Sequence, residues 1–341
     1  MHAPQRLDLA TISRLTELAD YIVPLTLGVV AELGVADHLT AGPCSIERLA
    51  ELTHTDERSL LLAMRCLASK GVFQEPRPDV FDLAPVGQYL RSDHPYSLRE
   101  GVTLQSAEIA AWSRVEHTMR TGEPAFQLVH RQPLWEYMGA NANDGQRFDA
   151  SQEAMTRLEV PFVNRLYRWD LVRTVVDLGG GSGALLGGLL ARRSELRGTL
   201  FDLPHVIEGA RARLSNAEGV ADRCTLIGGS YLDGPLPAGA DVYMMKRVLW
   251  GHADDEATKL LRNVRAAMRP DSALLIIEPV RSERPEAQIA KVMDLKLLVM
   301  GGGGSRNTSQ LERLFAAANL RLEQVTSAVV TSIVQVRPVV S

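Results

Sequence analysis

The amino-acid sequence predicts an α/β protein, in which a C-terminal doubly wound domain follows an all-helical, winged-helix-like N-terminal domain. Two observations predict this fold class. Apolar residues recur at helical spacing through the first part of the chain, as at Leu15, Leu18 and Ile22. After Trp169, short β-rich runs alternate with helical stretches, which implies a mainly parallel sheet with helices on both faces.

Length and composition bound the class of protein. At 341 residues the chain has room for about two domains, and 45% hydrophobic with 23% charged residues is usual for a globular protein. Lysine and arginine number 37 against 41 aspartates and glutamates, so the net charge is −4. The chain therefore lacks the positive surplus that draws proteins to nucleic acid or anionic membranes, and we expect neither partner.

Cysteine use and the N-terminus bear on location. Cys44, Cys66 and Cys224 are widely spaced and form no CxxC pair, so we expect buried thiols in a reducing compartment and no metal site. The first residues lack the charged-then-apolar pattern of a signal peptide, and no long uncharged apolar run follows. We therefore expect a cytoplasmic protein.

The N-terminal part carries a helix–turn–helix pattern. Residues 45–73 predict two helices around a polar turn, with Ser45 and Thr55 as N-caps and Gly71 as the final stop. Residues 72–85 predict a two-stranded wing. A DNA-binding regulator is thus an alternative. The second helix argues against it, because acids offset its basic residues and its centre is apolar, which favours packing or a dimer contact.

The rest of the chain divides into a helical connector and a strand–helix domain. Residues 106–170 predict amphipathic helix around an irregular, aromatic-rich stretch at 120–138, which either lines a ligand cleft or packs between domains. Five runs then predict strands: 174–178, 198–203, 224–229, 241–248 and 273–280. Residues 311–340 predict a helix and a closing hairpin.

A glycine-rich loop follows the first of these strands. Gly179, Gly181 and Gly183 allow a nucleotide-like ligand to approach the main chain where a Cβ would collide. Asp177 lies at the carboxyl end of that strand, and Asp202 ends the next one, where a carboxylate can accept both ribose hydroxyls. This second acid argues against NADP, and the GxGxG spacing differs from the GxGxxG of dinucleotide folds.

Four motifs together resemble a known family. LGGGSG (178–183), LFDLPHVIEGA (200–210), GGSYLDGPLPAGADVYMMKRVL (228–249) and RTGEPAFQLVHRQPLWEY (120–137) are similar to the S-adenosylmethionine-dependent O-methyltransferases of the plant caffeate type and their bacterial natural-product relatives. The resemblance implies a homodimer and S-adenosyl-L-methionine as cofactor, with S-adenosyl-L-homocysteine as product. It also implies three parts: a winged-helix-like dimerisation domain (1–105), a helical connector lining the acceptor cleft (106–170) and a Rossmann-like cofactor domain (171–341).

The resemblance implies cofactor-binding residues by position. Those bordering the methionine end, the ribose and the adenine are Asp177, Gly179, Gly181, Asp202, Leu203, Gly229, Ser230 and Tyr231. Many members have Asp followed by Phe where this chain has Ser230 and Tyr231. Lys246 either faces the cofactor or is a solvated lysine at a strand end.

The catalytic positions depart from the family. Its members use a histidine base at the start of an HDWDDE-type motif, oriented by two glutamates. Here KRVLWGHADDEA (246–257) places Trp250 at the base position and His252 where the family has tryptophan. Glu278 matches the first glutamate, whereas Ser305 stands in place of the second and Arg306 keeps the family's arginine.

Loss of the base leaves several readings open. A general base is worth ~10²–10⁴-fold, whereas orientation reaches effective molarities of ~10⁵–10⁸ M, so an acceptor that is already ionised can be methylated without a base. His252 is either a displaced base or a capping or packing residue. Trp250 either forms a wall for a planar substrate, or faces the sulfonium through cation–π attraction, or packs in the core.

The sequence predicts an enzyme that O-methylates a small, aromatic or polyketide-derived secondary metabolite, mainly by proximity and orientation. C-methylation, or a non-methylating reaction such as hydroxylation or a pericyclic rearrangement, is the alternative within enzymes. We expect the acceptor to contact Trp112, His117, Met155, Met293, Asp294, Leu297 and Met300. Core packing is the alternative for the methionines.

Overall fold

The computed structural model describes residues 8–103, 105–215, 217–282, 289–301, 303–327 and 331–339. The chain divides into two compact units, Met1–Leu104 and Gln105–Ser341. Residues 106–170, expected as a separate connector, belong to the second unit. Among the described residues, no helix combines the length and apolar character needed to cross a membrane.

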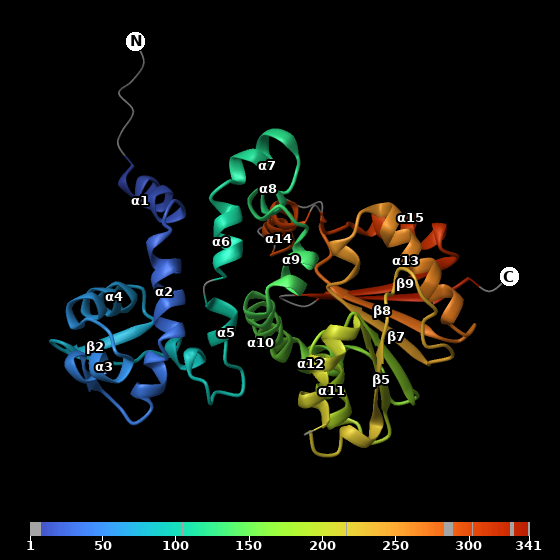
Figure 1. Ribbon diagram of the computed structural model, residues 1–341, viewed down its shortest axis with the longest axis horizontal. Coiled ribbons are helices and arrows are strands. Elements are labelled where there is room, and N and C mark those ends of the chain that lie inside the picture. The colour runs from blue at the N-terminus through green and yellow to red at the C-terminus, as the bar shows by residue number, and fades with distance from the viewer. Residues whose placement is uncertain are drawn as a thin grey trace, which may run out of the picture. The chain divides into compact units, whose positions relative to one another are not determined.

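The first unit combines helices with a small sheet (Figure 1). Its elements are α1 (Leu9–Leu18), α2 (Ile22–Glu32), η1 (Val35–Leu39), β1 (Cys44–Ser45), α3 (Ile46–Thr53), α4 (Glu57–Ser69), β2 (Phe73–Arg77), β3 (Val80–Leu83), η2 (Gly87–Leu90) and α5 (Arg99–Val102). The predicted wing is present as β2 and β3. The unit is not all-helical, however, because β1 joins them in an antiparallel sheet of order β1-β3-β2. Two residues are too short for a periodic signal, so the sequence did not predict β1.

The ends of the helix pair follow local chemistry. Ser45 caps α3 as predicted, but α4 is capped by Asp56 and not by Thr55. The Asp56 carboxylate accepts from the Ser59 N–H at 2.8 Å, which is a charge-assisted bond that a threonine hydroxyl does not match. α4 ends where predicted, since Gly71 adopts a φ of +76°.

The apolar side of α4 is buried in the first unit. Leu60, Met64 and Leu67 pack within its hydrophobic core. On the other side, Arg65 pairs with Glu75 at 2.9 Å and with a second carboxylate of the wing. The helix that a DNA-binding domain would insert into a groove therefore serves packing and pairs with its own wing.

The second unit is built on a seven-stranded sheet. Its elements are α6 (Ser106–Trp112), α7 (Val115–Thr121), α8 (Ala125–His130), α9 (Leu134–Ala140), α10 (Ala142–Leu166), β4 (Thr174–Leu178), α11 (Ala184–Arg192), β5 (Arg197–Asp202), α12 (Pro204–Ser215), η3 (Ala221–Arg223), β6 (Cys224–Gly228), β7 (Val242–Lys246), η4 (Leu249–Gly251), α13 (Asp254–Ala267), β8 (Ala273–Glu278), α14 (Ile289–Met300), α15 (Thr308–Ala317), β9 (Leu320–Ser327) and β10 (Ser332–Pro338). Each predicted strand is confirmed, starting within its predicted run or one residue earlier.

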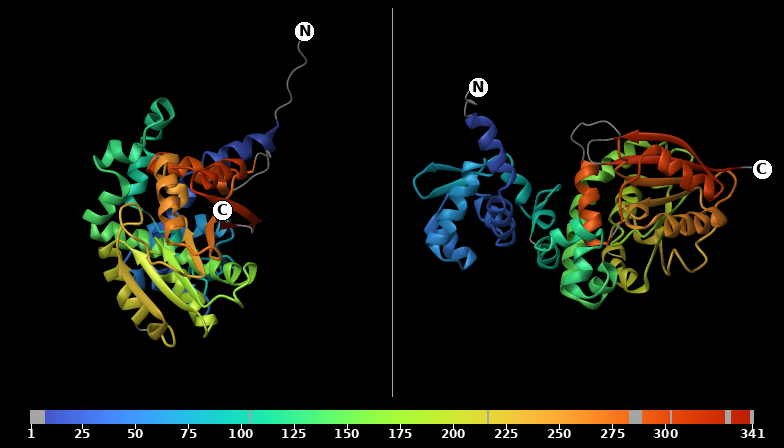
Figure 2. Two further views of the ribbon diagram at one scale, coloured as in Figure 1. Left: turned by 90° about the vertical axis from the view of Figure 1, so that its right-hand side faces the viewer. Right: turned by 90° about the horizontal axis from the view of Figure 1, so that it is seen from above.

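The sheet has the order β6-β5-β4-β7-β8-β10-β9, parallel from β6 to β8 and antiparallel at β10 and β9. Helices cover both faces (Figures 1 and 2). Alternate residues of each strand serve the two faces, so Val176 and Met245 pack with α13 and α15, whereas Val175 and Met244 pack with α10, α11 and α12. This confirms the doubly wound fold.

The strand order places a topological switch point at the carboxyl ends of the parallel strands. From β4 the chain adds β5 and β6 on one side, then returns to add β7 and β8 on the other. The connections that leave β4 and β7 run in opposite directions, so the carboxyl ends of these two neighbouring strands form the topological switch point, where such sheets bind ligands. The glycine loop follows β4, and Asp202 ends the adjacent β5.

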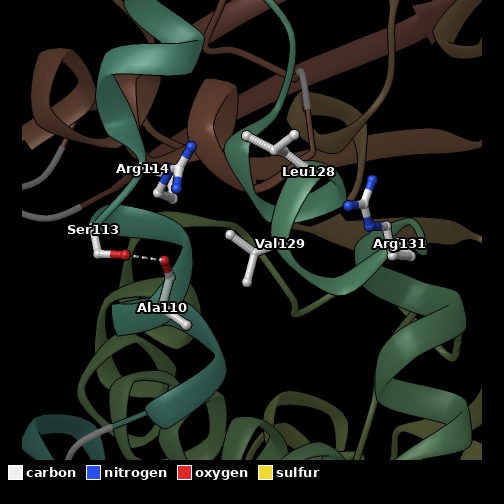
Figure 3. Close-up of a pocket in the computed structure, with 6 residues that line it drawn as sticks. All are labelled: Ala110, Ser113, Arg114, Leu128, Val129 and Arg131. Atoms are coloured by element: carbon white, nitrogen blue, oxygen red, sulfur yellow. Dashed lines mark hydrogen bonds between the residues drawn. The ribbon is translucent and has the colours of Figure 1, made fainter.

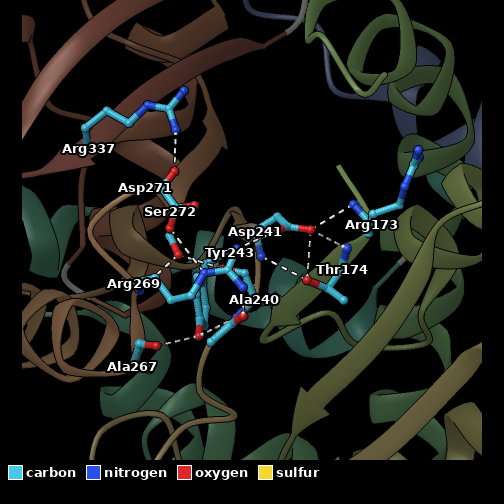
Figure 4. A network of polar contacts seen from close by, with 11 residues as sticks. Arg173, Thr174, Ala240, Asp241, Tyr243, Ala267, Arg269, Asp271, Ser272 and Arg337 are labelled. Atoms are coloured by element: carbon cyan, nitrogen blue, oxygen red, sulfur yellow. Dashed lines mark hydrogen bonds and ion pairs between the residues drawn. The ribbon is translucent and has the colours of Figure 1, made fainter. Parts of the chain in front are cut away.

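Asp241 connects several elements at the opposite end of the sheet, where the parallel strands begin (Figure 4). Its carboxylate accepts from the backbone N–H groups of Arg173 and Thr174, both at 2.8 Å, and pairs with Arg269. Burial alone would raise the pKa of Asp241, but these hydrogen bonds outweigh it and lower the pKa below its ordinary value. One carboxylate thus joins β4 to β7 and to the turn before β8.

Asp241→Asn should lower the free energy of unfolding at pH 7 by about 1–3 kcal/mol, because it replaces charge-assisted bonds. A carboxyl whose pKa is lowered by folding stabilises the fold above its unfolded pKa and loses that effect as pH falls through the folded pKa. The gap between wild type and variant should therefore narrow below about pH 4, as measured by denaturant unfolding.

Asp271→Asn is the matched control, since Asp271 also pairs with Arg269 but is 77% exposed. Its stability should stay within about 0.5 kcal/mol of wild type. Equal stabilities of Asp241→Asn and wild type at pH 7 would contradict the role given to Asp241.

Candidate active site

The loop between β4 and α11 is shaped by its glycines. Gly179, Gly181 and Gly183 have φ values of +66°, +58° and +73°, which side-chain-bearing residues rarely adopt. A Cβ on Gly180 would lie 2.6 Å from the Asp177 carboxylate, whereas a Cβ on Gly181 would meet no atom within 4 Å. The loop is therefore packed against the sheet at Gly180 and open at Gly181, where a ligand could approach the main chain.

Asp202 joins this loop to the end of β5. Its carboxylate accepts from the Gly181 N–H at 2.8 Å and from the Leu203 N–H at 2.7 Å. Burial raises the pKa of Asp202, and these two bonds oppose the rise. A carboxylate has about four acceptor sites. Two remain for the two hydroxyls of a ribose.

Asp177 is buried and unsatisfied. Neither of its carboxylate oxygens has a hydrogen-bond partner among the described residues. Burial raises the pKa of Asp177 to about 7, with nearby Lys246 opposing the rise. Such a group is a frequent mark of a functional site.

Lys246 lies at the end of β7, where its ammonium group contacts α10. It donates to the Thr156 hydroxyl at 2.6 Å and lies 3.5 Å from the Glu159 carboxylate. Glu159 also accepts from Arg247 at 2.7 Å. Burial lowers the pKa of Lys246 to about 8. The lysine is not solvated at the strand end, so that alternative is wrong.

The loop after β6 borders Asp202. The Gly229 N–H donates to the Asp202 backbone carbonyl at 2.9 Å, and a Cβ on Gly229 would lie 2.6 Å from the ring of Phe201. The Ser230 hydroxyl donates to Asp233 at 3.0 Å. Gly229 is therefore required for close packing, while the Ser230 side chain belongs to a turn.

Tyr231 and His252 meet across two loops. The tyrosine hydroxyl lies 3.0 Å from Nε2 of His252, and Nδ1 of His252 lies 3.1 Å from the Glu256 carboxylate. Glu256 is not among the residues predicted from the sequence. The available signal was its position in the first turn of α13, four residues after His252, which itself precedes the helix.

Trp250 occupies the predicted base position in η4, with 9% of its surface exposed. Its backbone N–H donates to Glu278 at 3.1 Å, and its carbonyl accepts from the Gly304 N–H at 2.8 Å. Burial raises the pKa of Glu278 to about 7, with the Trp250 N–H and Arg306 opposing the rise. Glu278 thus holds the main chain of η4.

The loop that carries Ser305 and Arg306 also supports η4. Arg306 donates to the carbonyls of Leu249 and His252 at 2.9 and 2.6 Å. The Ser305 N–H donates to the Asp294 carboxylate at 2.5 Å, and its hydroxyl has no partner among the residues described. Asp294 is therefore engaged in fixing this loop.

The residues expected to contact the acceptor spread over four helices. Met300 belongs to an apolar cluster of α6, α8 and α14, and Trp112 packs against the same cluster. His117 lies on α7, with Nε2 3.5 Å from the Thr121 hydroxyl. The remaining expected contacts on α10 and α14, all half-buried, are Met155, Met293 and Leu297. Their contact with substrate stays a prediction.

A hollow of about 390 Å³ opens between α6 and α8 (Figure 3). The residues that line it are Ala110, Ser113, Arg114, Leu128, Val129 and Arg131. None of the expected acceptor contacts lines it, so the hollow does not mark the predicted site. Within the described part of the chain, no three His, Cys, Asp or Glu side chains gather as a metal site.

The fold and the loop define an α/β protein with a site for a nucleoside cofactor. The open main chain at Gly181 and the two acceptor sites left on Asp202 fit a ligand that carries a ribose.

Comparisons with known proteins define the family. A model of the O-methyltransferase domain matches residues 112–321, and a model of the O-methyltransferase dimerisation domain matches residues 16–93. The chain is 36% identical over 324 residues to phenazine O-methyltransferase PhzM of Lysobacter antibioticus, covering 94% of each. It is similar to the solved structure of LaPhzM, with a TM-score of 0.91, 35% identity and coverage of 97% and 100%. The chain belongs to the O-methyltransferase family and is an S-adenosylmethionine-dependent O-methyltransferase.

Two further relatives bear on the chemistry. The structure of an O-methyltransferase, NcsB1, in complex with S-adenosylmethionine and 2-hydroxy-5-methyl naphthoic acid has a TM-score of 0.79 at 30% identity, covering 98% of this chain and 100% of that one. Aclacinomycin 10-hydroxylase RdmB of Streptomyces purpurascens is 32% identical over 315 residues, covering 90% of this chain and 84% of the relative. The chain is thus similar to proteins that are named for different reactions.

Asp202→Ala should weaken S-adenosylmethionine binding by roughly tenfold or more, because it removes charge-assisted hydrogen bonds to the ribose and to the loop. Calorimetric titration measures this directly. Asp222→Ala is the matched control. Asp222 lies in η3, just before β6 begins, at the end of the strands away from the glycine loop. The affinity of this variant for S-adenosylmethionine should equal that of wild type. An unchanged affinity of Asp202→Ala would refute the placement of the ribose.

Proposed function

We propose that this enzyme methylates a hydroxyl oxygen of a small, planar aromatic or polyketide-derived metabolite, mainly by proximity and orientation. The observation that carries the proposal is the environment of Trp250. The indole stands where the resembled family has its base, and its main chain is fixed by Glu278 and by the loop at Gly304. A rigid, apolar wall suits a flat acceptor better than it suits proton transfer.

Neither His252 nor Glu278, the two described groups beside Trp250 that the resemblance points to, is free to act as base in its place. Both ring nitrogens of His252 are engaged, by Tyr231 and Glu256. The Glu278 carboxylate is 2% exposed and accepts from the Trp250 N–H. The acceptor therefore enters as an anion or ionises in the site, and orientation supplies the rate.

The cofactor residues have separate roles. Bound S-adenosylmethionine supplies an electrophilic methyl group on a sulfonium. Asp202 holds the ribose hydroxyls, Gly181 leaves the main chain open to the ligand, and Asp177 borders the methionine end from beneath the glycine loop, where its carboxylate is buried. Lys246 fixes α10 at the end of β7 and keeps positive charge beside Asp177.

The names of the relatives support an aromatic acceptor, and the match to the dimerisation domain together with the exposed face of α1 supports a dimer. The relatives include enzymes acting on a phenazine and a complex with a naphthoic acid. In the first unit α1 buries none of its residues, and it exposes Leu9, Leu15 and Leu18 by 69%, 67% and 67%. A homodimer through this unit would cover such a surface.

Incubation with methyl-deuterated S-adenosylmethionine and a panel of phenols, quinones and keto acids tests the reaction. Mass spectrometry should show a labelled methyl ether together with S-adenosylhomocysteine. Asp202→Ala, which binds the cofactor weakly, should form much less of both. Cofactor binding without a labelled product from any phenol would contradict O-methylation.

The pH dependence tests the absence of a base. For acceptors of graded acidity, kcat/KM should rise with pH up to the pKa of each acceptor, so the midpoints should follow the acceptors. A common midpoint for all acceptors would show that a group on the enzyme titrates instead, and would contradict catalysis by positioning alone.

A second candidate is a reaction without methyl transfer. The resemblance to a 10-hydroxylase, together with the replaced base, favours hydroxylation over C-methylation as this second candidate. An aerobic incubation with an added reductant distinguishes it, because its product would gain one oxygen atom from dioxygen and would not carry the label. Labelling on carbon would indicate C-methylation.

A further inference from the structure

The chain of hydrogen bonds from Glu256 through His252 to Tyr231 has a defined polarity. An ionised Glu256 only accepts, so Nδ1 of His252 donates to it across 3.1 Å, and in the neutral imidazole Nε2 is left as an acceptor. The Tyr231 hydroxyl therefore donates to Nε2 across 3.0 Å. The His252 side chain is 11% exposed and satisfied at both nitrogens. It takes a proton from a substrate only by breaking its bond to Tyr231.

Tyr231 is fixed at both ends by this arrangement. The Asn263 amide donates to its backbone carbonyl at 3.0 Å, and His252 holds its hydroxyl. The imidazole also packs edge-on against the phenol ring, with ring centroids 5.6 Å apart. The ring therefore has one orientation, set by neighbours from α13 and from the loop before it.

The fixed ring lies between the glycine loop and the acid of β5. A Cβ on Gly179 would come within 3.3 Å of the Tyr231 ring. Burial raises the pKa of Tyr231 to about 12, and the charge of Asp202 adds to the rise. The phenol thus stays protonated and lies close enough to Asp202 to sense its charge. A nucleoside whose ribose bonds to Asp202 would lie beside this ring.

We propose that His252 is a positioning residue: through Tyr231 it holds one wall of the nucleoside site in its binding geometry. The inference rests on the proposed function, because it places the ribose of S-adenosylmethionine at Asp202. A wall that is already ordered loses little entropy when the ligand binds. Breaking the Tyr231–His252 bond should therefore weaken cofactor affinity more than it slows the chemical step.

A double-mutant cycle on cofactor affinity tests the proposal. The variants are Tyr231→Phe, His252→Phe and the double variant. Each single change keeps an aromatic ring at its position and removes the hydrogen bond. Each single change should raise the calorimetric Kd for S-adenosylhomocysteine by about 3–10-fold. The double variant should be no weaker than the weaker single one, because both changes remove the same bond. This arm needs no acceptor substrate.

Tyr243→Phe is the matched control. The Tyr243 hydroxyl lies 2.8 Å from the carbonyls of Pro237 and Ala267, at the edge of the sheet away from the glycine loop (Figure 4). Its loss removes a buried hydroxyl without touching the site, so the Kd should equal that of wild type. An equal rise in Kd for Tyr243→Phe would trace the effect to general destabilisation and overturn the proposal.

Kinetics with an active acceptor separate positioning from base catalysis. In His252→Phe, KM for the cofactor should rise by more than kcat falls. A kcat loss beyond ~10²-fold at unchanged Kd would make His252 the base and overturn the proposal. Fully additive changes in Kd would do the same, because the two residues would then act separately. Failure of the wild type to bind S-adenosylhomocysteine would instead contradict the proposed function.

Discussion

The hydrogen bond from the Gly181 N–H to the Asp202 carboxylate is the constraint on which the candidate site depends. It joins the loop after β4 to the end of β5 across 2.8 Å, and it exists only because the loop can turn at positive φ. Burial of Asp202 costs free energy that this bond partly recovers. The carboxylate is thereby held in one place with acceptor sites to spare, and the neighbouring loops, with Gly229 and Tyr231, pack around it.

Buried charge fixes the long helix α10 against this edge of the sheet. Lys246 and Arg247 converge on Glu159, which is 1% exposed, so two cations share one anion away from water. Asp177 adds a second acidic group nearby, with Lys246 as its opposing charge. Such a cluster is costly to break, since each member left alone would be a desolvated charge. It ties the helices before the sheet to the strand that ends next to the cofactor site.

Local chemistry explains which features the sequence could predict. Short β-rich runs predicted each strand of the second unit, and the run of glycines predicted the loop, because each of these signals lies within a few residues. Asp202 was predicted from its place at the end of the next strand. Contacts between distant residues gave no such signal. The Arg247–Glu159 pair spans 88 residues and Tyr231–His252 spans 21, so neither follows from spacing. Both members of the second pair are departures from the family pattern, and only the structure shows that they contact one another.

The bond between Glu278 and residue 250 has a consequence for how this enzyme could have changed over evolution. Glu278 accepts from the backbone N–H of Trp250, and a backbone N–H is present whatever non-proline side chain stands there. Replacing the side chain at this position therefore leaves the buried Glu278 carboxylate with its hydrogen bond, and the exchange costs only the packing of the indole. The side chain at position 250 could therefore change during evolution while the hydrogen bond to Glu278 still held the main chain of η4. Relatives of one architecture can in this way come to bear names for different reactions.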